Sequence, residues 1–293
     1  MIRFNKILKR TAGTILLAAL FSSSIISTSK AEEESGPAFA PPVSKTTVPE
    51  IGPGMSLRSN CVVVLDPGHG KTGGHYSGCH FDYNGTTYYE DIITMKIANY
   101  TKEYLEHNSN YTVYLTKDSS EVTVPLDQRA AFAASVRADL FVSLHVDSIA
   151  GNGTTRNAYG ASSMSPRTGR FHNDIAIQSQ EAANTILNQL TGLGLHNRGL
   201  ILQDSKNGTL YPDGSTADYY AIPRYSQMYG LRGFIIEHGY INCISDLTGF
   251  LSTDEQLKKL GEADAKGIIE YLNKAGKSTF VPDGNSSQTP PTN

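Results

Sequence analysis

The sequence predicts a single α/β domain built on a mostly parallel or mixed central sheet with helices on both faces. Two observations lead to this prediction. Short apolar runs typical of strands alternate with helical patterns along the chain, and segments rich in Pro, Gly and Ser flank one continuous patterned region, residues 59–276. The 293 residues, 39% of them hydrophobic, suffice for one well-buried domain with flanking segments. Alternating strands and helices favour a sheet covered on both sides.

Four strands are predicted from short apolar runs. Residues 62–65 are β-branched or aliphatic and end at Asp-Pro-Gly, and residues 111–116 alternate in polarity. Residues 140–145 (LFVSLH) and 234–236 (FII) are continuous apolar runs of the kind found in buried strands. The order of these strands in the sheet cannot be predicted from the patterns.

Helical periodicity separates the predicted strands. Helices are predicted at residues 90–107, 126–136 and 175–190. A last helix is expected to begin with a capping box formed by Ser252 and Glu255, and to end before Gly276.

Residues 1–31 have the three-part pattern of a secretory signal peptide. A basic start is followed by an apolar stretch over residues 12–26, and Ser29-Lys30-Ala31 supplies small residues for cleavage after Ala31. An uncleaved anchor is the alternative, because the apolar stretch is close to spanning length. Residues 32–58 are expected to be a flexible linker and residues 277–293 a disordered tail.

The charge of the exported chain excludes some partners. Cleavage after Ala31 removes five of the 25 Lys and Arg residues and none of the 28 Asp and Glu residues, leaving a formal charge of 20 − 28 = −8. An acidic surface gives no electrostatic reason to bind nucleic acid or an anionic membrane. We therefore expect no nucleic acid partner, and no membrane span after cleavage.

Three cysteines allow at most one internal disulfide. None are paired at the short spacing of a metal-binding motif. Cys79 and Cys243 both fall in loops that follow strand ends, whereas Cys61 precedes its strand at the opposite edge. If a bridge forms, we expect it between Cys79 and Cys243, with Cys61 left free.

Chemically competent side chains lie at the ends of three predicted strands. His69 follows the first strand, His145 ends the third and Glu237 follows the fourth, while Glu90 opens the first helix. Because active sites of open α/β sheets gather at the carboxyl ends of strands, we expect these residues to converge. Two imidazoles and one carboxylate suit a zinc ion with an open fourth position, and a second carboxylate would serve as general base.

Each of these residues also has a structural explanation. A histidine at a strand end is commonly a hydrogen-bonded structural group, and Glu90 suits the first turn of a helix because of the helix dipole. Glu237 is harder to explain in this way, because burying a carboxylate after an apolar run is costly without a partner. His75 and His80 are alternative imidazole ligands.

Several segments occur together, in order, over about residues 60–273. They are residues 65–70 (LDPGHG), Glu90 ahead of residues 92–98 (IITMKIA), residues 126–129 (LDQR) with 138–145 (ADLFVSLH), residues 197–199 (NRG) and residues 236–242 (IEHGYIN). This series resembles the zinc-dependent N-acetylmuramoyl-L-alanine amidases of type 3. Each motif alone is weak evidence, but the ordered set is specific.

The resemblance implies both a site and a reaction. His69, Glu90 and His145 would bind Zn²⁺, and Glu237 would be the catalytic carboxylate. The implied reaction is hydrolysis of the amide between N-acetylmuramic acid and L-alanine in peptidoglycan, by a secreted protein of the cell wall or periplasm. Whether an activating protein partner exists is left open.

The matched segments also contain three residues without an implied catalytic role. Arg129 and Arg198 are each expected to pack against a buried carboxylate. His238, the neighbour of Glu237, is expected to point to the opposite face of its strand and to be structural.

Two other functions stay open. The chain could be another zinc peptidase that cuts the stem peptide itself, or a catalytically silent wall-binding or regulatory protein of the same fold. A binding module has no need of Glu237 in addition to the three implied ligands, which argues against the silent protein.

Overall fold

The computed structural model describes residues 61–71, 78–149 and 158–275. The predicted signal peptide, linker and tail lie outside these residues, as does His75. Within the described ranges, none of the helices combines the length and apolar character needed to cross a bilayer.

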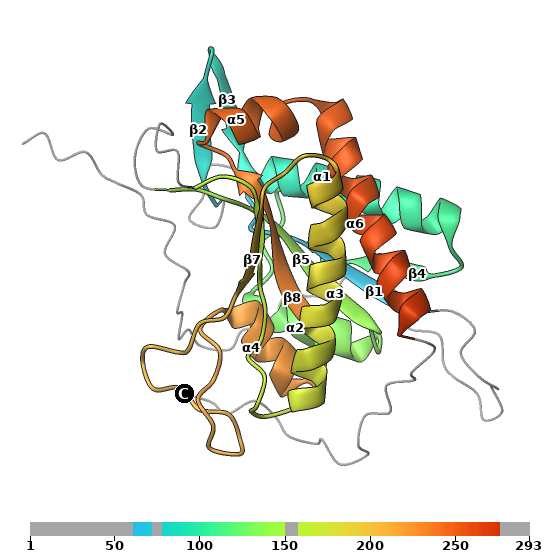
Figure 1. Cartoon of the computed structure of the whole chain (residues 1–293), viewed down its shortest axis with the longest axis vertical. Coiled ribbons are helices and arrows are strands. Elements are labelled where there is room, and N and C mark those ends of the chain that lie inside the picture. The colour runs from blue at the N-terminus through green and yellow to red at the C-terminus, as the bar shows by residue number, and fades with distance from the viewer. Residues whose placement is uncertain (1–60, 72–77, 150–157, 276–293) are drawn as a thin grey trace, which may run out of the picture.

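Helices and strands alternate over most of the described chain (Figure 1). The elements are β1 (Val62–Pro67), β2 (His80–Tyr83), β3 (Thr86–Tyr89), α1 (Glu90–Asn108), β4 (Thr112–Leu115), α2 (Leu126–Ser135), β5 (Leu140–Asp147), β6 (Ala161–Met164), α3 (Asn173–Gly192), β7 (Asn197–Ile201), α4 (Ala221–Met228), β8 (Gly233–Tyr240), α5 (Ile244–Asp246), the π-helical turn η1 (Leu247–Leu251) and α6 (Asp254–Lys274).

The central sheet has six strands in the order β4-β1-β5-β8-β6-β7. The first four run parallel, β6 pairs antiparallel with β8, and β7 runs parallel to β6. The central strands β1, β5 and β8 are buried along almost their whole length, which explains their continuous apolar runs. The predicted α/β class with a mixed sheet is confirmed.

Helices cover both faces of this sheet. One face packs against α1, α3 and α6, and the other against α2 and α4 (Figure 1). Side chains of a strand alternate between faces, so Val63 and Leu65 enter the larger core under α1, α3 and α6, while Val64 enters the smaller core under α2 and α4.

The strands differ in extent and number from the prediction. β5 continues to Asp147, so His145 lies within its strand rather than at its end. β8 continues to Tyr240, so Glu237 lies within its strand rather than after it. The sequence patterns also missed β6, β7, α4 and the hairpin β2–β3. The hairpin turn is Asn84-Gly85, with φ of 50° and 79°, and this dipeptide is a strong hairpin signal.

The capping box of α6 lies one residue later than expected. Thr253, not Ser252, is the N-cap; its hydroxyl accepts from the Gln256 amide, and the Gln256 side chain accepts from the Thr253 amide at 3.0 Å. Both pairs have the required spacing, so the sequence alone did not separate Thr253–Gln256 from Ser252–Glu255.

The expected Cys79–Cys243 bridge is wrong for this structure, in which no disulfide joins any two of Cys61, Cys79 and Cys243. Cys79 Sγ donates to the Val146 carbonyl at 3.3 Å, and Cys243 Sγ lies 3.2 Å from Ser245 Oγ. Each of these two sulfurs therefore has a polar partner in a different part of the fold.

His238 is structural, as expected. Its side chain points toward α6, and its Nε2 lies 2.8 Å from Asp264 Oδ2 on that helix. Its Nδ1 lies 3.0 Å from the carbonyl oxygen of His145 on β5. Neither the His238 nor the Asp264 side chain is exposed. Burial opposes the charged imidazole, but the charge and hydrogen bond of Asp264 outweigh it, so the pKa of His238 is raised. The pair joins β8 to α6.

Replacing Asp264 by Ala should therefore lower the free energy of unfolding by about 3–5 kcal/mol, because it leaves His238 buried without its carboxylate. Urea denaturation of the full chain measures this loss. The matched control is Asp254→Ala on the same helix, which removes an exposed ion pair with Lys96 (2.8 Å) and should cost at most about 1 kcal/mol. Equal losses in the two variants would contradict a structural role for the buried pair.

Candidate metal centre

Glu90 is the first residue of α1 and directly follows the hairpin β2–β3. Its buried carboxylate is fixed by two backbone amides: Cys79 N donates to Oε2 at 2.9 Å, and Val146 N donates to Oε1 at 3.1 Å. The positive end of the α1 dipole also favours a carboxylate at this position. Three separate segments therefore orient one side chain.

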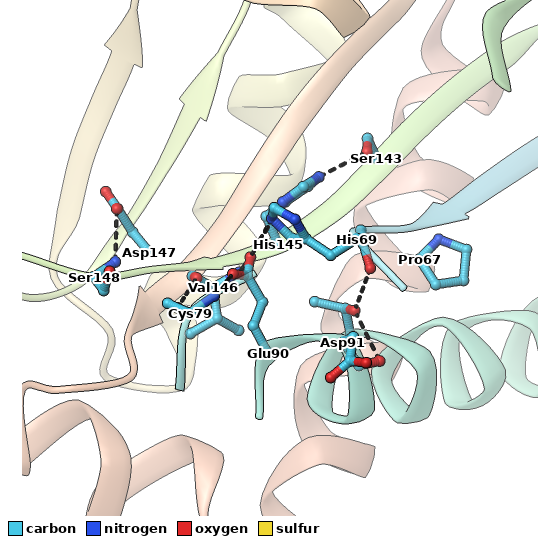
Figure 2. A network of polar contacts seen from close by, with 12 residues as sticks. Pro67, His69, Cys79, Glu90, Asp91, Ser143, His145, Val146, Asp147 and Ser148 are labelled. Atoms are coloured by element: carbon cyan, nitrogen blue, oxygen red, sulfur yellow. Dashed lines mark hydrogen bonds and ion pairs between the residues drawn. The ribbon is translucent and has the colours of Figure 1, made fainter. Parts of the chain in front are cut away.

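Two imidazoles converge on this carboxylate (Figure 2). His69 follows β1 in a left-handed conformation, with φ of 55°, and its Nε2 lies 3.3 Å from Glu90 Oε1. His145 extends from β5, and its Nδ1 lies 3.2 Å from the same oxygen. The rings meet edge to face with centroids 4.8 Å apart. The three predicted ligands are thus brought together.

The donor set fits a metal ion. One ligand atom from each of His69, Glu90 and His145 lies within 4.8 Å of the others. In a tetrahedral site with ligand distances of about 2.0–2.1 Å, neighbouring ligand atoms are about 3.3–3.4 Å apart, and the two separations from Glu90 Oε1 are 3.2 and 3.3 Å. His80 is exposed on β2 and does not belong to this group.

The surroundings of Glu90 and His145 shift the pKa values of both side chains. Burial would raise the pKa of Glu90, but the two imidazoles beside it, His69 first and then His145, outweigh burial and hold that pKa well below its usual value. Burial is the main cause of a lowered pKa for His145. Metal ligands must include neutral imidazoles, and the lowered pKa of His145 favours its neutral form.

Glu237 lies on β8 beside His145 on β5. The two residues are Cα partners in the parallel ladder, so their side chains leave the sheet on the same face. Glu237 is only 7% exposed, and its Oε2 has no hydrogen-bond partner within the described part of the chain. Burial, and then the charges of Asp147 and Glu90, raise its pKa well above the usual value. Burying a carboxylate in this way is costly unless its oxygens gain a hydrogen-bond partner.

Two further residues near Glu237 were not predicted. Ser162 on β6 is the Cα partner of Glu237 on its other side, and its buried hydroxyl also has no partner among the residues described. Tyr220 precedes α4, and burial together with the charges of Asp147 and Glu237 raises its pKa to about 12. Neither residue belongs to a motif, and β6 itself was missed.

The expectation for Arg129 is confirmed. Its Nη1 lies 3.1 Å from Asp66 Oδ1, and both side chains are buried. The guanidinium of Arg198, on β7, lies over the Tyr240 ring with 5.2 Å between Cζ and the ring centroid.

Fold and site together define an α/β protein with a candidate metal-hydrolase centre at the carboxyl ends of its parallel strands. The family model described as N-acetylmuramoyl-L-alanine amidase matches residues 63–270, and the chain belongs to this family.

Individual known proteins are similar to parts of this chain. The amidase AmiC of Escherichia coli O6:H1 is 37% identical over 111 residues, which cover 38% of this chain but only 24% of AmiC. Cwp6 from Clostridium difficile is 28% identical with a TM-score of 0.56, over 73% of this chain and 30% of that one. The catalytic domain of CwlV, an amidase from Bacillus (Paenibacillus) polymyxa, shares the fold at 22% identity with a TM-score of 0.53, over 73% of this chain and 98% of CwlV.

Gly68 allows His145 to sit against the loop after β1. A Cβ added at Gly68 would lie 2.6–2.7 Å from three atoms of the His145 ring. We expect Gly68→Ala to displace the imidazole and weaken metal binding about 10–100-fold, as when ligand support is removed. Equilibrium dialysis followed by metal analysis measures this.

Gly192→Ala is the matched control, because a Cβ there meets nothing within 4 Å. It should bind metal as the unsubstituted chain does. Equal metal affinity in both variants would show that His145 is not a ligand.

Proposed function

We propose that this chain is a zinc-dependent amidase that hydrolyses the amide bond between N-acetylmuramic acid and L-alanine in peptidoglycan. The main support is the convergence of His69, Glu90 and His145, with two ligand separations of 3.2 and 3.3 Å, beside the buried Glu237. Membership of the amidase family supplies the substrate class.

Each residue has a distinct role in this proposal. His69, Glu90 and His145 hold the zinc ion. Zinc, when bound, supplies a Lewis acid that polarises the scissile carbonyl and lowers the pKa of water. Glu237 takes a proton from the attacking water and donates it to the leaving L-alanine amine. Its Oε2 is available for this transfer, since no described residue forms a hydrogen bond with it.

The rival functions make different demands on the site. A silent wall-binding protein has no need of a buried carboxylate beside the three candidate ligands, whereas a hydrolase would use the Glu237 oxygen that has no partner among the described residues. A stem peptidase would use the same zinc chemistry on another bond. The products therefore decide between the two enzymes.

Replacing Glu237 by Gln should leave zinc binding unchanged and lower turnover by about 10²–10⁴-fold, the usual contribution of a general acid–base residue. Metal analysis gives the zinc content. Mass spectrometry of digested, purified peptidoglycan gives turnover, since an amidase releases intact stems beginning with L-alanine. The wild-type chain should lose activity after chelation and regain it with zinc.

Glu255→Gln is the control, because Glu255 is exposed on α6 and pairs only with Lys259 among the described residues. It should keep full activity. Retained activity in Glu237→Gln would contradict the proposed role of Glu237, and stems cut internally would identify a peptidase.

We also propose that the chain is exported and acts in the cell wall or periplasm. The basic, apolar and small-residue pattern of residues 1–31 supports this. Amino-terminal sequencing of the protein from the producing cell should give Glu32 as the first residue. A chain that still begins at Met1 would instead indicate an uncleaved anchor.

A further inference from the structure

A buried chain of polar groups lies behind His145, on the side away from Glu90. Ser143 precedes His145 by two residues on β5, so both side chains leave the same face of the sheet. Ser143 Oγ is 3.1 Å from His145 Nε2 and 2.6 Å from Asp66 Oδ2. Figure 2 shows Ser143 and Glu90 on opposite sides of the imidazole. Neither Ser143 nor Asp66 is exposed.

The direction of these hydrogen bonds follows from the groups involved. A carboxylate only accepts, so the single hydroxyl proton of Ser143 is donated to Asp66. Toward His145 the hydroxyl oxygen must then accept, which requires a proton on Nε2. A neutral imidazole carries one N–H. Nδ1, the nitrogen that faces Glu90, therefore presents a lone pair.

Asp66 is itself held rigidly. Its Oδ1 accepts from Thr116 Oγ1 at 2.5 Å and from Arg129 Nη1 at 3.1 Å, which leaves Oδ2 for Ser143. Arg129 Nη2 also donates to the carbonyl oxygen of His69 at 3.0 Å. One buried carboxylate is thus connected to both histidines of the candidate metal centre.

The proposed zinc site explains why two hydrogen-bond acceptors would face each other at this position. Nδ1 of His145 and Oε1 of Glu90 lie 3.2 Å apart, and two acceptors at this distance repel each other unless a cation lies between them. If the proton sat on Nδ1 instead, it would occupy the space in which a metal must bind.

We propose that Asp66 and Ser143 are positioning residues that fix the tautomer of His145 and so present its Nδ1 to the metal. This inference rests on the proposed zinc site. It does not depend on which peptidoglycan bond is cut. Fixed by Ser143, the imidazole need not lose a proton or rotate before it binds the metal, and metal affinity rises accordingly.

A purely structural role for Asp66 would be to neutralise the buried Arg129. Replacing Ser143 separates the two roles, because the hydroxyl of Ser143 contacts Asp66 and His145, while the Asp66–Arg129 ion pair keeps all its atoms. The tautomer of His145 would change only if the positioning role is correct.

The test compares Ser143→Ala with the wild-type full chain. Competition with a chromophoric chelator should show an about 10–100-fold weaker zinc affinity for Ser143→Ala. Ser226→Ala is the matched control: Ser226 is equally buried, but its hydroxyl donates to the Ile222 carbonyl within α4 at 2.7 Å, and its loss should leave zinc affinity unchanged.

Imidazole nitrogen NMR supplies a second measurement that does not require the variant to fold. In the zinc-loaded wild-type chain, His145 should show a protonated Nε2 and a metal-bound Nδ1. Unchanged zinc affinity in Ser143→Ala, or a proton on Nδ1 in the wild type, would overturn the inference. Failure of the amidase proposal would be seen separately, in the products that the wild type releases from peptidoglycan.

Discussion

The carboxylate of Glu90 is held below the protein surface by amides from two other segments and faces two imidazoles. Burying an anion is unfavourable unless hydrogen bonds and opposite charge replace the lost water. Those replacements come from the residue before the hairpin, from β5, from the loop after β1 and from the amino end of α1. The position of one charge therefore couples segments that are distant in the sequence.

This coupling restricts the backbone around the site. His69 has a positive φ, which is strained for a residue with a side chain. Gly78 also has a positive φ, and an added Cβ there would collide with Glu90 Oε2 and lie 2.7 Å from His69 Cδ2. The loops approach His69 and Glu90 so closely that only particular residues fit. Such local strain persists because the buried polar contacts stabilise it.

The sequence predicted the parts of this structure that depend on periodicity. β1, β5 and β8 are continuous apolar runs because parallel central strands are covered on both faces. β6 was missed, since its sequence ASSM places buried serines where the strand pattern requires apolar residues. The Asn84-Gly85 turn was an available signal that was not used.

The candidate site was predictable to a similar degree, and for a different reason. Strand ends and ordered motifs pointed to His69, Glu90, His145 and Glu237, because such residues have no simple role in packing. Ser143 lies within the matched segment of residues 138–145, but the sequence assigned it no role. A serine within a buried strand gives no periodic signal, and its proposed role depends on Asp66, which is 77 residues away in the sequence.

Glu237 and His238 are adjacent on β8, and both are buried polar residues, but their hydrogen bonding differs. His238 faces α6, where both of its ring nitrogens have partners. Glu237 faces the other way, beside His145, and one of its oxygens has no partner in the described chain. Folding stability alone would favour satisfying both groups or replacing them with apolar residues. The unsatisfied oxygen lies beside the group of possible metal ligands, where a substrate or water molecule would supply the missing hydrogen bond. This difference in hydrogen bonding, rather than burial itself, distinguishes Glu237, the candidate for chemistry, from the structural His238.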